Sequence, residues 1–423
     1  MIAPRVLIIS NNSFSNIYNN GKTLEALFSS FPKANLAQLF FHEGSLPDFS
    51  FCENYWKISE MDIIRNIGRG NKCVGREVLP QPDTEAKEIG SYPKVLRFVK
   101  EKTGDLTRDM IWRCCTWYSQ SLDEWLRRFN PQIIFFVGSS ASFSTRIAMR
   151  LSSSLSVPMA VYYTDDYLLS INRESLIQKI RFNRIFSLYK KVIGFSNLHF
   201  AIGDMMAQEY SKCFNTSFYP IMNSVKIDAF SAPLNNKEIV ISYFGGLHLN
   251  RWQMLARLAK LLPQNAKLYV YTAPENIDEK RKKTLDDAGV ELKGLLKGSE
   301  LKDAMKKADA LLHVESDDEN NRRFTRLAIS TKLPEYLISG RPVIGFGPVE
   351  VASMRLLSDN EIGLVVNSDK SDTEIKETLA DFVDNYEKRK YLATKGYQYA
   401  EKKFDENNNS KVLMERLLNV INQ

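Results

Sequence analysis

The 423-residue sequence contains few cysteines and no long apolar segment. Its five cysteines (positions 52, 73, 114, 115 and 213) form no metal-binding spacing, and the adjacent Cys114 and Cys115 are better explained as core residues than as a redox pair. No apolar run reaches the roughly 18 residues of a membrane-spanning helix. The strand pattern starts at Val6–Ile9, so we expect no secretory signal. These absences argue against a zinc protein, an integral membrane protein and a secreted disulfide-rich protein, and we expect a cytoplasmic location.

Length and charge indicate a two-domain protein with an anionic partner. The chain is too long for one ordinary core, and its 44% hydrophobic and 25% charged residues are typical of globular domains. Residues 1–226 contain 27 Lys and Arg against 20 Asp and Glu, whereas residues 227–423 contain 30 of each. The surplus of positive charge suits a phosphate-bearing substrate or phospholipid headgroups. Because there is no zinc-finger or RNA-recognition signature, we expect no nucleic-acid partner.

The beginning of the chain alternates apolar strands with helical segments. Val6–Ser10 has a strand pattern, a polar loop follows, and a helix is predicted over Gly21–Phe31, before a second strand at Leu36–Phe41. Ligands of α/β sheets bind beside the loops at the carboxyl ends of strands, which makes Gly21 a candidate binding residue. Because no G-x-G-x-x-G motif is present, we do not expect a dehydrogenase-type dinucleotide site.

From residue 132 the alternation becomes regular and leads to a pair of acidic residues. Strands predicted at Ile133–Val137, Met159–Tyr163 and Leu198–Ile202 are separated by helical segments, which indicates a parallel sheet. Asp165 and Asp166 follow the second of these strands. Two carboxylates at such a strand end can orient sugar hydroxyls, or one of them can act as a base. The alternative is an aspartate that caps the next helix.

Residues 42–130 have a less regular pattern. We predict helices over Tyr92–Lys102 and Asp109–Phe129, the second because its apolar residues lie three and four positions apart. The alternative for residues 62–102 is a mobile insertion that contacts an acceptor, and both interpretations remain open.

Residues 171–193 contain six basic residues and one acidic residue among large apolar and aromatic side chains. A basic amphipathic segment of this kind can lie on an anionic lipid surface. A helix with one face in the core and a solvated basic face explains the pattern equally well. An anionic membrane surface is therefore a candidate partner of this segment.

The second half opens with an apolar strand pattern, two glycines and a helix. Gly245 and Gly246 form a loop of the kind that binds phosphate at a helix N-terminus. Arg251 opens the helix, where its forked guanidinium can bind two phosphate oxygens or simply lie on the helix surface. The next strand ends at Thr272, a candidate position for binding a nucleotide base. The charged segment 315–323 follows a later strand, where a donor-sugar site and a solvated loop are both plausible.

The stretch 324–348 has the order loop, helix, tight turn and buried strand. Ser330 or Thr331 can cap the helix, free N–H groups at its start favour an anion, and Lys332 adds a positive charge. Glu335, about one turn further along, can accept hydrogen bonds from a diol. A phosphate beside a sugar diol describes a nucleotide, although an ordinary capped helix would also fit this pattern.

Two motifs resemble those of a known family. The segment Thr-Lys-Leu-Pro-Glu-Tyr-Leu-Ile-Ser-Gly-Arg-Pro-Val-Ile, which starts at Thr331, resembles the donor-site motif of GT-B glycosyltransferases of the retaining group called family 4. The resemblance is strongest to the branch that acts in bacterial surface-polysaccharide assembly. The segment from Gly246 to Trp252, which ends in Asn-Arg-Trp, is similar to the glycine-containing Asn-Arg-Trp motif of that branch. Many members carry another glutamate eight residues before the one matching Glu335, and here that position is Leu327.

This resemblance implies roles for individual residues. The glutamate matching Glu335 binds the nucleotide ribose, and the helix start at Thr331 and Lys332 holds the diphosphate, which Arg251 also faces. The first residue of the aspartate pair, Asp165, lies near the transferred sugar. We expect no cofactor and no dedicated metal, because basic residues and helix dipoles can stabilise the leaving diphosphate. The donor-binding candidates are Gly21, Gly245, Gly246, Arg251, Thr272, Ser330, Thr331, Lys332 and Glu335, and the catalytic candidates are Asp165, Asp166, Arg251 and Lys332.

We therefore expect an α/β protein of GT-B fold with two Rossmann-like, doubly wound domains facing across a cleft. Residues 1–228 would bind the acceptor, residues 229–400 the nucleotide sugar, and the helix in 401–423 would pack back on the first domain. The expected reaction is transfer of a hexose from a nucleoside-diphosphate sugar to a glycan or lipid-linked acceptor, during assembly of capsule, O-antigen or exopolysaccharide at the inner face of the membrane. The alternatives are a catalytically silent partner subunit and a nucleotide-sugar epimerase. Leu327 leaves retention and inversion open, and inversion would make Asp165 or Asp166 the base.

Overall fold

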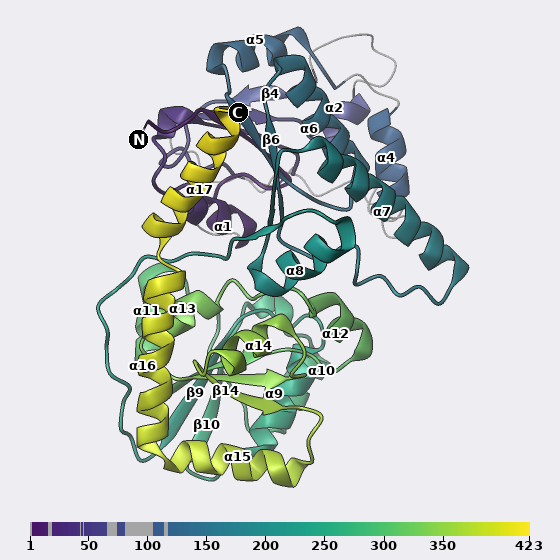
Figure 1. The fold of residues 1–423 in the computed structure, drawn as a ribbon. Coiled ribbons are helices and arrows are strands. Elements are labelled where there is room, and N and C mark those ends of the chain that lie inside the picture. The colour runs from purple at the N-terminus through teal and green to yellow at the C-terminus, as the bar shows by residue number, and fades with distance from the viewer. Residues whose placement is uncertain are drawn as a thin grey trace. The chain divides into compact units, whose positions relative to one another are not determined.

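The computed structural model describes residues 2–15, 19–42, 44, 46–65, 74–80, 105–113 and 117–423 (Figure 1). The chain forms two compact units. Unit 1 consists of Met1–Ile221 together with Asn407–Gln423, and unit 2 consists of Met222–Glu406. Unit 1 is therefore built from both ends of the chain, whereas unit 2 is one continuous segment.

Unit 1 is organised around a sheet that, within the described residues, has eight strands in the order β4-β3-β2-β1-β5-β6-β7-β8. Neighbouring strands are parallel, except that β4 runs antiparallel to β3. The central strands β1 and β2 are buried along their whole length, which suits parallel strands covered on both faces. The strands are β1 Val6–Ser10, β2 Leu36–Phe40, β3 Asn54–Lys57, β4 Arg76–Val78, β5 Ile133–Val137, β6 Met159–Tyr163, β7 Leu198–Ala201 and β8 Tyr219–Pro220.

The helices of unit 1 connect these strands, and the C-terminal helix joins them from the far end of the sequence. In α17 (Glu406–Ile421), Ser410 Oγ accepts a hydrogen bond from the backbone N–H of Ser30 at 3.0 Å. The guanidinium of Arg416 lies 3.7 Å from the centre of the Tyr219 ring. The other described helices are α1 Asn19–Leu27, α2 Glu60–Arg65, α4 Asp105–Arg113, α5 Gln120–Phe129, α6 Ser142–Leu155, α7 Leu176–Phe195, α8 Gly203–Phe214 and the short 3-10 helix Lys33–Asn35.

The prediction of one helix over Asp109–Phe129 is wrong. Helix α4 ends at Arg113, and α5 begins after Ser119, whose Oγ accepts a hydrogen bond from the backbone N–H of Leu122 (3.2 Å). The spacing of the apolar residues did not reveal this break, because both helices bury one face. The sequence analysis also missed β3, α2 and β4. The helix predicted over 92–102, most of the insertion at 62–102, and Cys73, Cys114 and Cys115 lie outside the described residues.

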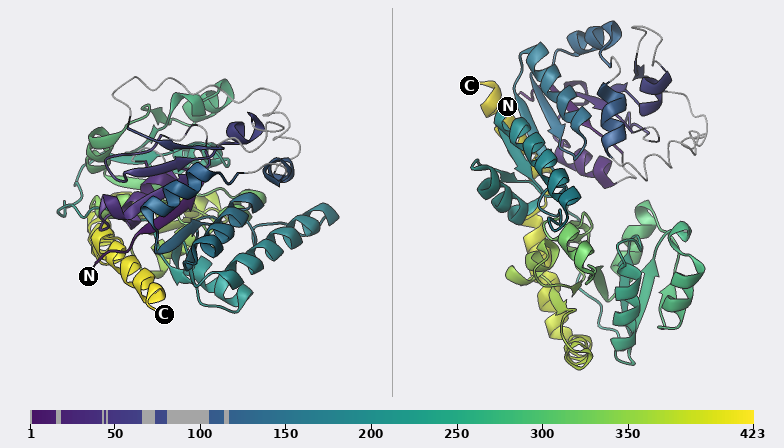
Figure 2. Two further views of the ribbon diagram at one scale, coloured as in Figure 1. Left: turned by 90° about the horizontal axis from the view of Figure 1, so that it is seen from above. Right: turned by 90° about the vertical axis from the view of Figure 1, so that its right-hand side faces the viewer.

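Unit 2 contains a six-stranded sheet of order β11-β10-β9-β12-β13-β14 in which all neighbours are parallel. The strands are β9 Ile239–Phe244, β10 Ala266–Tyr271, β11 Glu291–Leu292, β12 Ala310–Val314, β13 Val343–Gly347 and β14 Leu364–Asn367. The helices are α9 Arg251–Leu261, α10 Glu279–Asp286, α11 Gly298–Lys307, α12 Glu319–Thr325, α13 Leu333–Ile338, α14 Ala352–Asp359, α15 Asp372–Asp384, α16 Tyr386–Lys403 and the 3-10 helix Pro274–Asn276. Figures 1 and 2 show helices on both faces of this sheet. Both sheets thus have the doubly wound, Rossmann-like arrangement.

Helix α13 differs in detail from its prediction. Lys332 occupies the N-cap position in place of Ser330 or Thr331, and its side chain makes no capping hydrogen bond. Ser330 Oγ accepts a hydrogen bond from the backbone N–H of Lys332 (3.4 Å). The predicted tight turn follows the helix: Gly340 has φ 73°, and an added Cβ would clash with the carbonyl oxygen of Ser231. The charged segment 315–323 is only partly a loop, because α12 starts within it. Among the helices that the structure describes, none has the length and apolar composition needed to cross a bilayer.

Candidate active site

The candidate donor residues of unit 2 lie at one edge of its sheet. Parallel strands end at the same edge, and each connecting helix begins there, so this edge is where ligands of doubly wound sheets bind. The loop from Gly245 to Asn250 follows β9, Thr272 follows β10, and Glu315 follows β12. Helix α13, with Lys332 and Glu335 at its start, leads from this edge back to β13.

Arg251 is held firmly at the start of α9. Its Nε donates to the carbonyl oxygen of Val314 (3.1 Å), and its Nη2 donates to Glu315 Oε2 (3.1 Å). Its Nη1 lies 3.4 Å from His248 Nε2, on the more exposed side. His313 Nε2 lies 3.2 Å from the other oxygen of Glu315. The guanidinium is therefore oriented before any ligand arrives.

The pair of Arg251 and Glu315 is buried and stays ionised. The Glu315 residue is 3% exposed, and burial alone would raise its pKa. The charge of Arg251 and the contact with His313 outweigh that effect and hold the pKa of Glu315 below its usual value. Burial likewise acts to lower the pKa of Arg251, but Glu315 more than compensates and the pKa is raised. The raised pKa keeps the guanidinium of Arg251 positively charged.

The loop before Arg251 has an unusual backbone. Leu249 (φ 55°) and Asn250 (φ 59°) are both left-handed, which costs a residue such as leucine about 1 kcal/mol or more. A Cβ on Gly246 would lie 2.6 Å from Nδ1 of the His248 side chain, so a larger residue at this position would require the imidazole to move. Strained backbone of this kind often occurs at binding sites, because the surrounding contacts hold it there.

Tyr336 connects α13 to the end of β9. Its hydroxyl accepts a hydrogen bond from the backbone N–H of Phe244 (3.1 Å) and lies 3.2 Å from the carbonyl oxygen of the same residue, to which it donates. This contact brings the helix that carries Lys332 and Glu335 to the strand that precedes Gly245. Lys332 and Glu335 are both partly exposed and both engaged in interactions with the protein.

The other predicted donor residues of unit 2 are held by burial or by hydrogen bonds to other groups of the protein. Thr272 is 1% exposed, and its Oγ1 accepts a hydrogen bond from Asn276 Nδ2 (3.2 Å) within the loop after β10. Ser330 and Thr331 are partly exposed, and the carbonyl oxygen of Thr331 accepts from Asn223 Nδ2 (2.8 Å). Leu327, at the position of the additional family glutamate, is fully buried, so an apolar side chain packs there.

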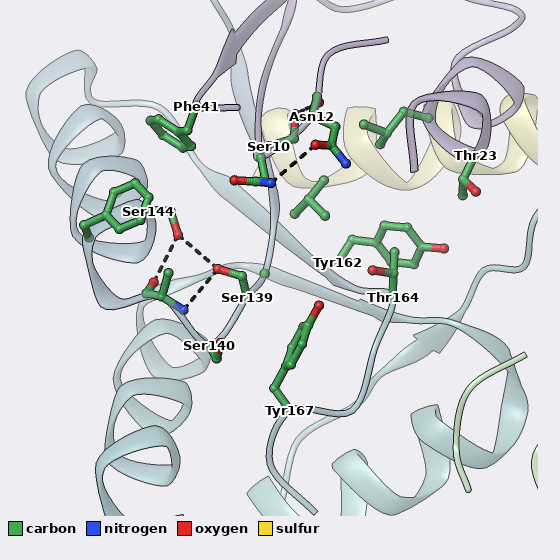
Figure 3. A pocket seen from close by; sticks show the side chains of 16 residues that line it. Ser10, Asn12, Thr23, Phe41, Ser139, Ser140, Ser144, Tyr162, Thr164 and Tyr167 are labelled. Carbon is green, nitrogen blue, oxygen red and sulfur yellow. Dashed lines mark hydrogen bonds between the residues drawn. The ribbon is translucent and has the colours of Figure 1, made fainter. Parts of the chain in front are cut away.

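Unit 1 has a pocket of about 180 Å³ at the carboxyl ends of β1, β5 and β6. Figure 3 shows Ser139, Thr164 and Tyr167, from two different strand ends, around the same space. None of the lining residues has a charged side chain. They are Ser10, Asn11, Asn12, Thr23, Leu24, Phe41, Val137, Gly138, Ser139, Ser140, Ala141, Phe143, Ser144, Tyr162, Thr164 and Tyr167.

The helix N-terminus beside this pocket is already occupied by a carboxylate. Asp109 Oδ1 accepts hydrogen bonds from the backbone N–H groups of Ser142 (3.1 Å) and Phe143 (3.2 Å), the first residues of α6. Asp109 is 6% exposed and also lies 3.4 Å from the guanidinium of Arg184. An anion that entered the pocket would therefore find these helix donors in use. The pocket suits a neutral polar group.

The two adjacent aspartates after β6 have different surroundings. Asp166 is 1% exposed, and its Oδ1 accepts hydrogen bonds from the backbone N–H groups of Leu168 (3.1 Å) and Leu169 (2.8 Å) and from Tyr210 Oη (2.9 Å). It therefore caps the loop that follows β6. The cap of the next helix, α7, is instead Ser175.

Asp165 lies beside the pocket. Its Oδ2 accepts hydrogen bonds from Thr164 Oγ1 (3.0 Å) and Tyr167 Oη (3.3 Å), and both donors belong to residues that line the pocket. Burial raises the pKa of Asp165, more than these hydrogen bonds lower it. Of the two aspartates, Asp165 is the one placed to contact a ligand.

Gly21 lies inside α1, which begins at Asn19, earlier than predicted. It is buried, and a Cβ there would lie 2.6 Å from the carbonyl oxygen of Ser13. The glycine allows the polar loop to pack closely on the helix. The pocket residues of this helix are Thr23 and Leu24.

The predicted site residues thus divide between the units. Gly21, Asp165 and Asp166 belong to unit 1, and all the other candidates belong to unit 2. Sequence reasoning missed His313 and Tyr336, and it included Glu315 only as part of the charged segment 315–323, for which a donor-sugar site and a solvated loop were both plausible. A carboxylate directly after the buried strand β12 was a usable signal for Glu315, whereas nothing local marked its contact with Arg251. The described residues contain no group of three His, Cys, Asp or Glu side chains arranged to hold a metal ion, and the absence of a metal requirement stays a prediction.

Comparison with solved structures identifies the fold. HepE from Anabaena, solved with UDP, aligns with a TM-score of 0.62 at 10% identity over 98% of this chain and 100% of that chain. TarM gives 0.61 at 12% identity over 99% of both chains. WaaG, a glycosyltransferase involved in lipopolysaccharide biosynthesis, gives 0.57 at 12% identity over 97% of this chain and 99% of that chain. The chain has the GT-B fold of glycosyltransferases. No protein-family model and no curated protein sequence matches it.

Proposed function

We propose that this protein transfers a sugar from a nucleoside-diphosphate sugar to a hydroxyl group of an acceptor. The observation that carries this proposal is the oriented guanidinium of Arg251, held by Glu315 and Val314 at the ligand-binding edge of unit 2. When the bond between sugar and diphosphate breaks, negative charge grows on the leaving diphosphate. A positive group that is already in place stabilises this charge without reorganising.

The other contacts to the donor would come from residues at the same edge of the sheet. Lys332 at the start of α13 would add a second positive charge for the diphosphate, and Glu335 would accept hydrogen bonds from the ribose diol. Thr272 would lie near the base. HepE has been solved with UDP-glucose, which supports testing a uridine donor first.

The acceptor would enter the pocket of unit 1. Hydroxyl, amide and aromatic side chains without a charge suit a neutral sugar or alcohol end, so any phosphate of the acceptor would stay outside. Asp165 would orient the attacking hydroxyl, and it would be the base if the reaction inverts the configuration. An acceptor pocket also favours transfer over epimerisation, which needs no acceptor.

The finer assignment rests on the sequence motifs. Their resemblance to family 4 supports a retaining hexosyltransferase that works at the cytoplasmic face of the membrane in capsule, O-antigen or exopolysaccharide assembly. The fold likeness to WaaG, which is involved in lipopolysaccharide biosynthesis, agrees with such a role.

A thermal-shift panel with UDP, GDP, ADP and CMP tests the proposal. One diphosphate at about a hundred times its dissociation constant should stabilise the protein by about 2.7 kcal/mol. The matching sugar nucleotides are then assayed for sugar transfer, and NMR of the product distinguishes retention from inversion. If no nucleotide stabilises the full-length protein, the proposal fails and a catalytically silent partner subunit becomes the better explanation.

A further inference from the structure

The side chain of His248 lies against the loop that joins β9 to α9. A Cβ on Gly246 would lie 2.6 Å from Nδ1 and 3.0 Å from Cε1 of the imidazole, so this edge of the ring faces the glycine. The left-handed residues Leu249 and Asn250 turn the chain between the imidazole and Arg251. His248 is exposed, so a ligand at this edge of unit 2 can reach its ring.

Both ends of this loop are held by hydrogen bonds. Tyr243 Oη donates to the carbonyl oxygen of Gly246 (2.7 Å), and Arg251 is held by Val314 and Glu315. The imidazole therefore lies between two fixed groups. Little conformational freedom would be lost when it binds a ligand, which favours binding.

Arg251 determines which ring nitrogen of His248 carries the proton. A guanidinium has only donors, and Nη1 of Arg251 lies 3.4 Å from His248 Nε2, so Nε2 must be the unprotonated nitrogen that accepts. The proton of the neutral imidazole is then on Nδ1. Burial and the charge of Arg251 lower the pKa of His248 more than Glu315 raises it, which favours the neutral form.

Nδ1 is thus a neutral N–H donor beside the glycine of the loop. A flipped ring would place a carbon atom against Nη1 of Arg251 and lose this bond, so the same contact decides which edge of the ring carries Nδ1. Within the part of the chain that the structure describes, no residue accepts a hydrogen bond from Nδ1. Hydrogen bonds from an N–H group to an ionised oxygen are about twice as strong as bonds to a neutral one, and a phosphate offers such oxygens.

We propose that the Nδ1–H group of His248 donates a hydrogen bond to the diphosphate of the sugar nucleotide, while Nε2 remains bonded to Arg251. This inference rests on the proposed function, which places the diphosphate at Arg251. The imidazole would contribute a neutral donor and the guanidinium a positive charge to the same group. The alternative is that His248 only orients Arg251 through Nε2. The two roles use different ring nitrogens, so substitutions can separate them.

Asparagine and glutamine at this position test the two roles. Asparagine can place an amide N–H near the position of Nδ1 but does not reach Arg251, whereas glutamine can place an oxygen near the position of Nε2 and has no donor at Nδ1. In titration calorimetry His248→Asn should bind UDP within about threefold of the wild type, and His248→Gln and His248→Ala should bind it about tenfold more weakly. Uridine, which has no phosphate, should bind all these proteins equally. If the nucleotide panel selects another diphosphate, that nucleotide and its nucleoside are the probes.

The matched control is His42→Gln, which removes an exposed imidazole of unit 1 and should bind UDP as the wild type does. Equal UDP affinities of His248→Gln and the wild type would overturn the inference alone, as would a loss in His248→Asn at least as large as that in His248→Gln. A wild type that binds no nucleoside diphosphate would overturn the proposed function, and this inference with it.

Imidazole ¹⁵N NMR tests the tautomer before any ligand is added. The signals that His248→Gln removes should belong to a ring with its proton on Nδ1, and addition of UDP should shift the Nδ1 signal. A proton on Nε2 in the free protein, or an Nδ1 signal that stays unchanged at saturating UDP, would overturn the inference.

Discussion

The edges at which the strands of the two sheets end have the same architecture and different electrostatic character. In both units parallel strands end beside the start of a helix. In unit 1 the first N–H groups of α6 are satisfied by Asp109, and the neighbouring pocket has no charged lining residue. In unit 2 the start of α9 carries Arg251, which is backed by the buried carboxylate of Glu315.

This comparison shows how similar sheets can accept different ligands. The fold determines where a ligand binds, because strand ends and helix starts meet at one edge. The side chains at that edge determine the charge of the ligand. An uncharged edge beside an Asp165 of raised pKa suits a hydroxyl acceptor, and a positively charged edge suits a diphosphate.

The largest expected effect comes from removing the charge of the unit 2 edge. The double variant Arg251→Met/Glu315→Met should lower kcat/KM for the sugar nucleotide by about a thousandfold, because an oriented positive group is lost from the developing diphosphate charge. The free energy of unfolding of this variant should change little, since buried ion pairs can often be replaced by apolar residues at a small cost in stability. Steady-state kinetics and urea unfolding measure the two quantities.

The matched single variant Arg251→Ala separates binding from stability. It leaves Glu315 buried without its main partner and should cost about 3–5 kcal/mol of unfolding free energy. If the double variant retains wild-type kinetics, Arg251 does not serve the reaction. The difference in charge between the two edges would then not determine which ligand each edge binds.

A comparison of Asp165 with Asp166 tests the unit 1 edge. Asp165→Asn should reduce turnover by about a hundredfold with little change in melting temperature, because its carboxylate accepts hydrogen bonds from Thr164 and Tyr167, which line the pocket. Asp166→Ala should instead cost about 2–3 kcal/mol of stability, because two backbone N–H groups and the hydroxyl of Tyr210 lose their acceptor. Loss of turnover only in Asp166→Asn, which keeps an acceptor oxygen, would reverse our assignment of the two residues.

Asp109 tests why the unit 1 pocket favours a neutral group. Asp109→Ala frees two backbone N–H groups at the start of α6 and should cost about 1–2 kcal/mol in unfolding free energy. Sulfate should restore part of this stability in the alanine variant and not in Asp109→Asn, whose amide oxygen can still accept these bonds. Equal responses of the two variants to sulfate would show that Asp109 does not block an anion site.

The smallest effect concerns Glu25, which follows the pocket residues Thr23 and Leu24 in α1. Burial, with a contribution from Asp48, raises the pKa of Glu25 to about 7. A raised pKa in the folded state means that stability is greatest below the unfolded-state pKa and falls as the pH rises through about 7. Between pH 5 and pH 8 the wild type should lose about 1–2 kcal/mol more than Glu25→Gln, after allowance for screening by solvent. Urea unfolding at both pH values measures this difference, and parallel pH profiles would contradict it.

The sequence was informative where structure follows from local pattern. The strands Ile133–Val137 and Met159–Tyr163 are as predicted, because an uninterrupted apolar run between helical segments fits few structures other than a parallel strand. The tight turn after α13 was also predictable, because Gly340 can adopt a positive φ at little cost and Pro342 cannot continue the helix.

The sequence did not predict contacts between residues far apart in the chain, or the direction in which a side chain points. The contact of Arg251 with Glu315 joins residues 64 positions apart, and no local pattern announces it. Asp165 and Asp166 have the same chemistry, and only the course of the backbone determines that the carboxylate of Asp166 is the buried one. The short strand β4 pairs antiparallel with β3, and a strand of this length has too few residues for a period to be recognised.

Hydrogen–deuterium exchange of the protein with and without UDP tests whether the diphosphate binds at the edge of unit 2. We expect slower exchange in peptides that cover the loop from Gly245 to Arg251 and the start of α13 at Ser330–Tyr336. We expect no change in peptides that cover Gly138–Ser144 at the pocket of unit 1. Protection at Gly138–Ser144 without protection at Gly245–Arg251 would contradict this expectation, because the diphosphate would then bind at the uncharged edge.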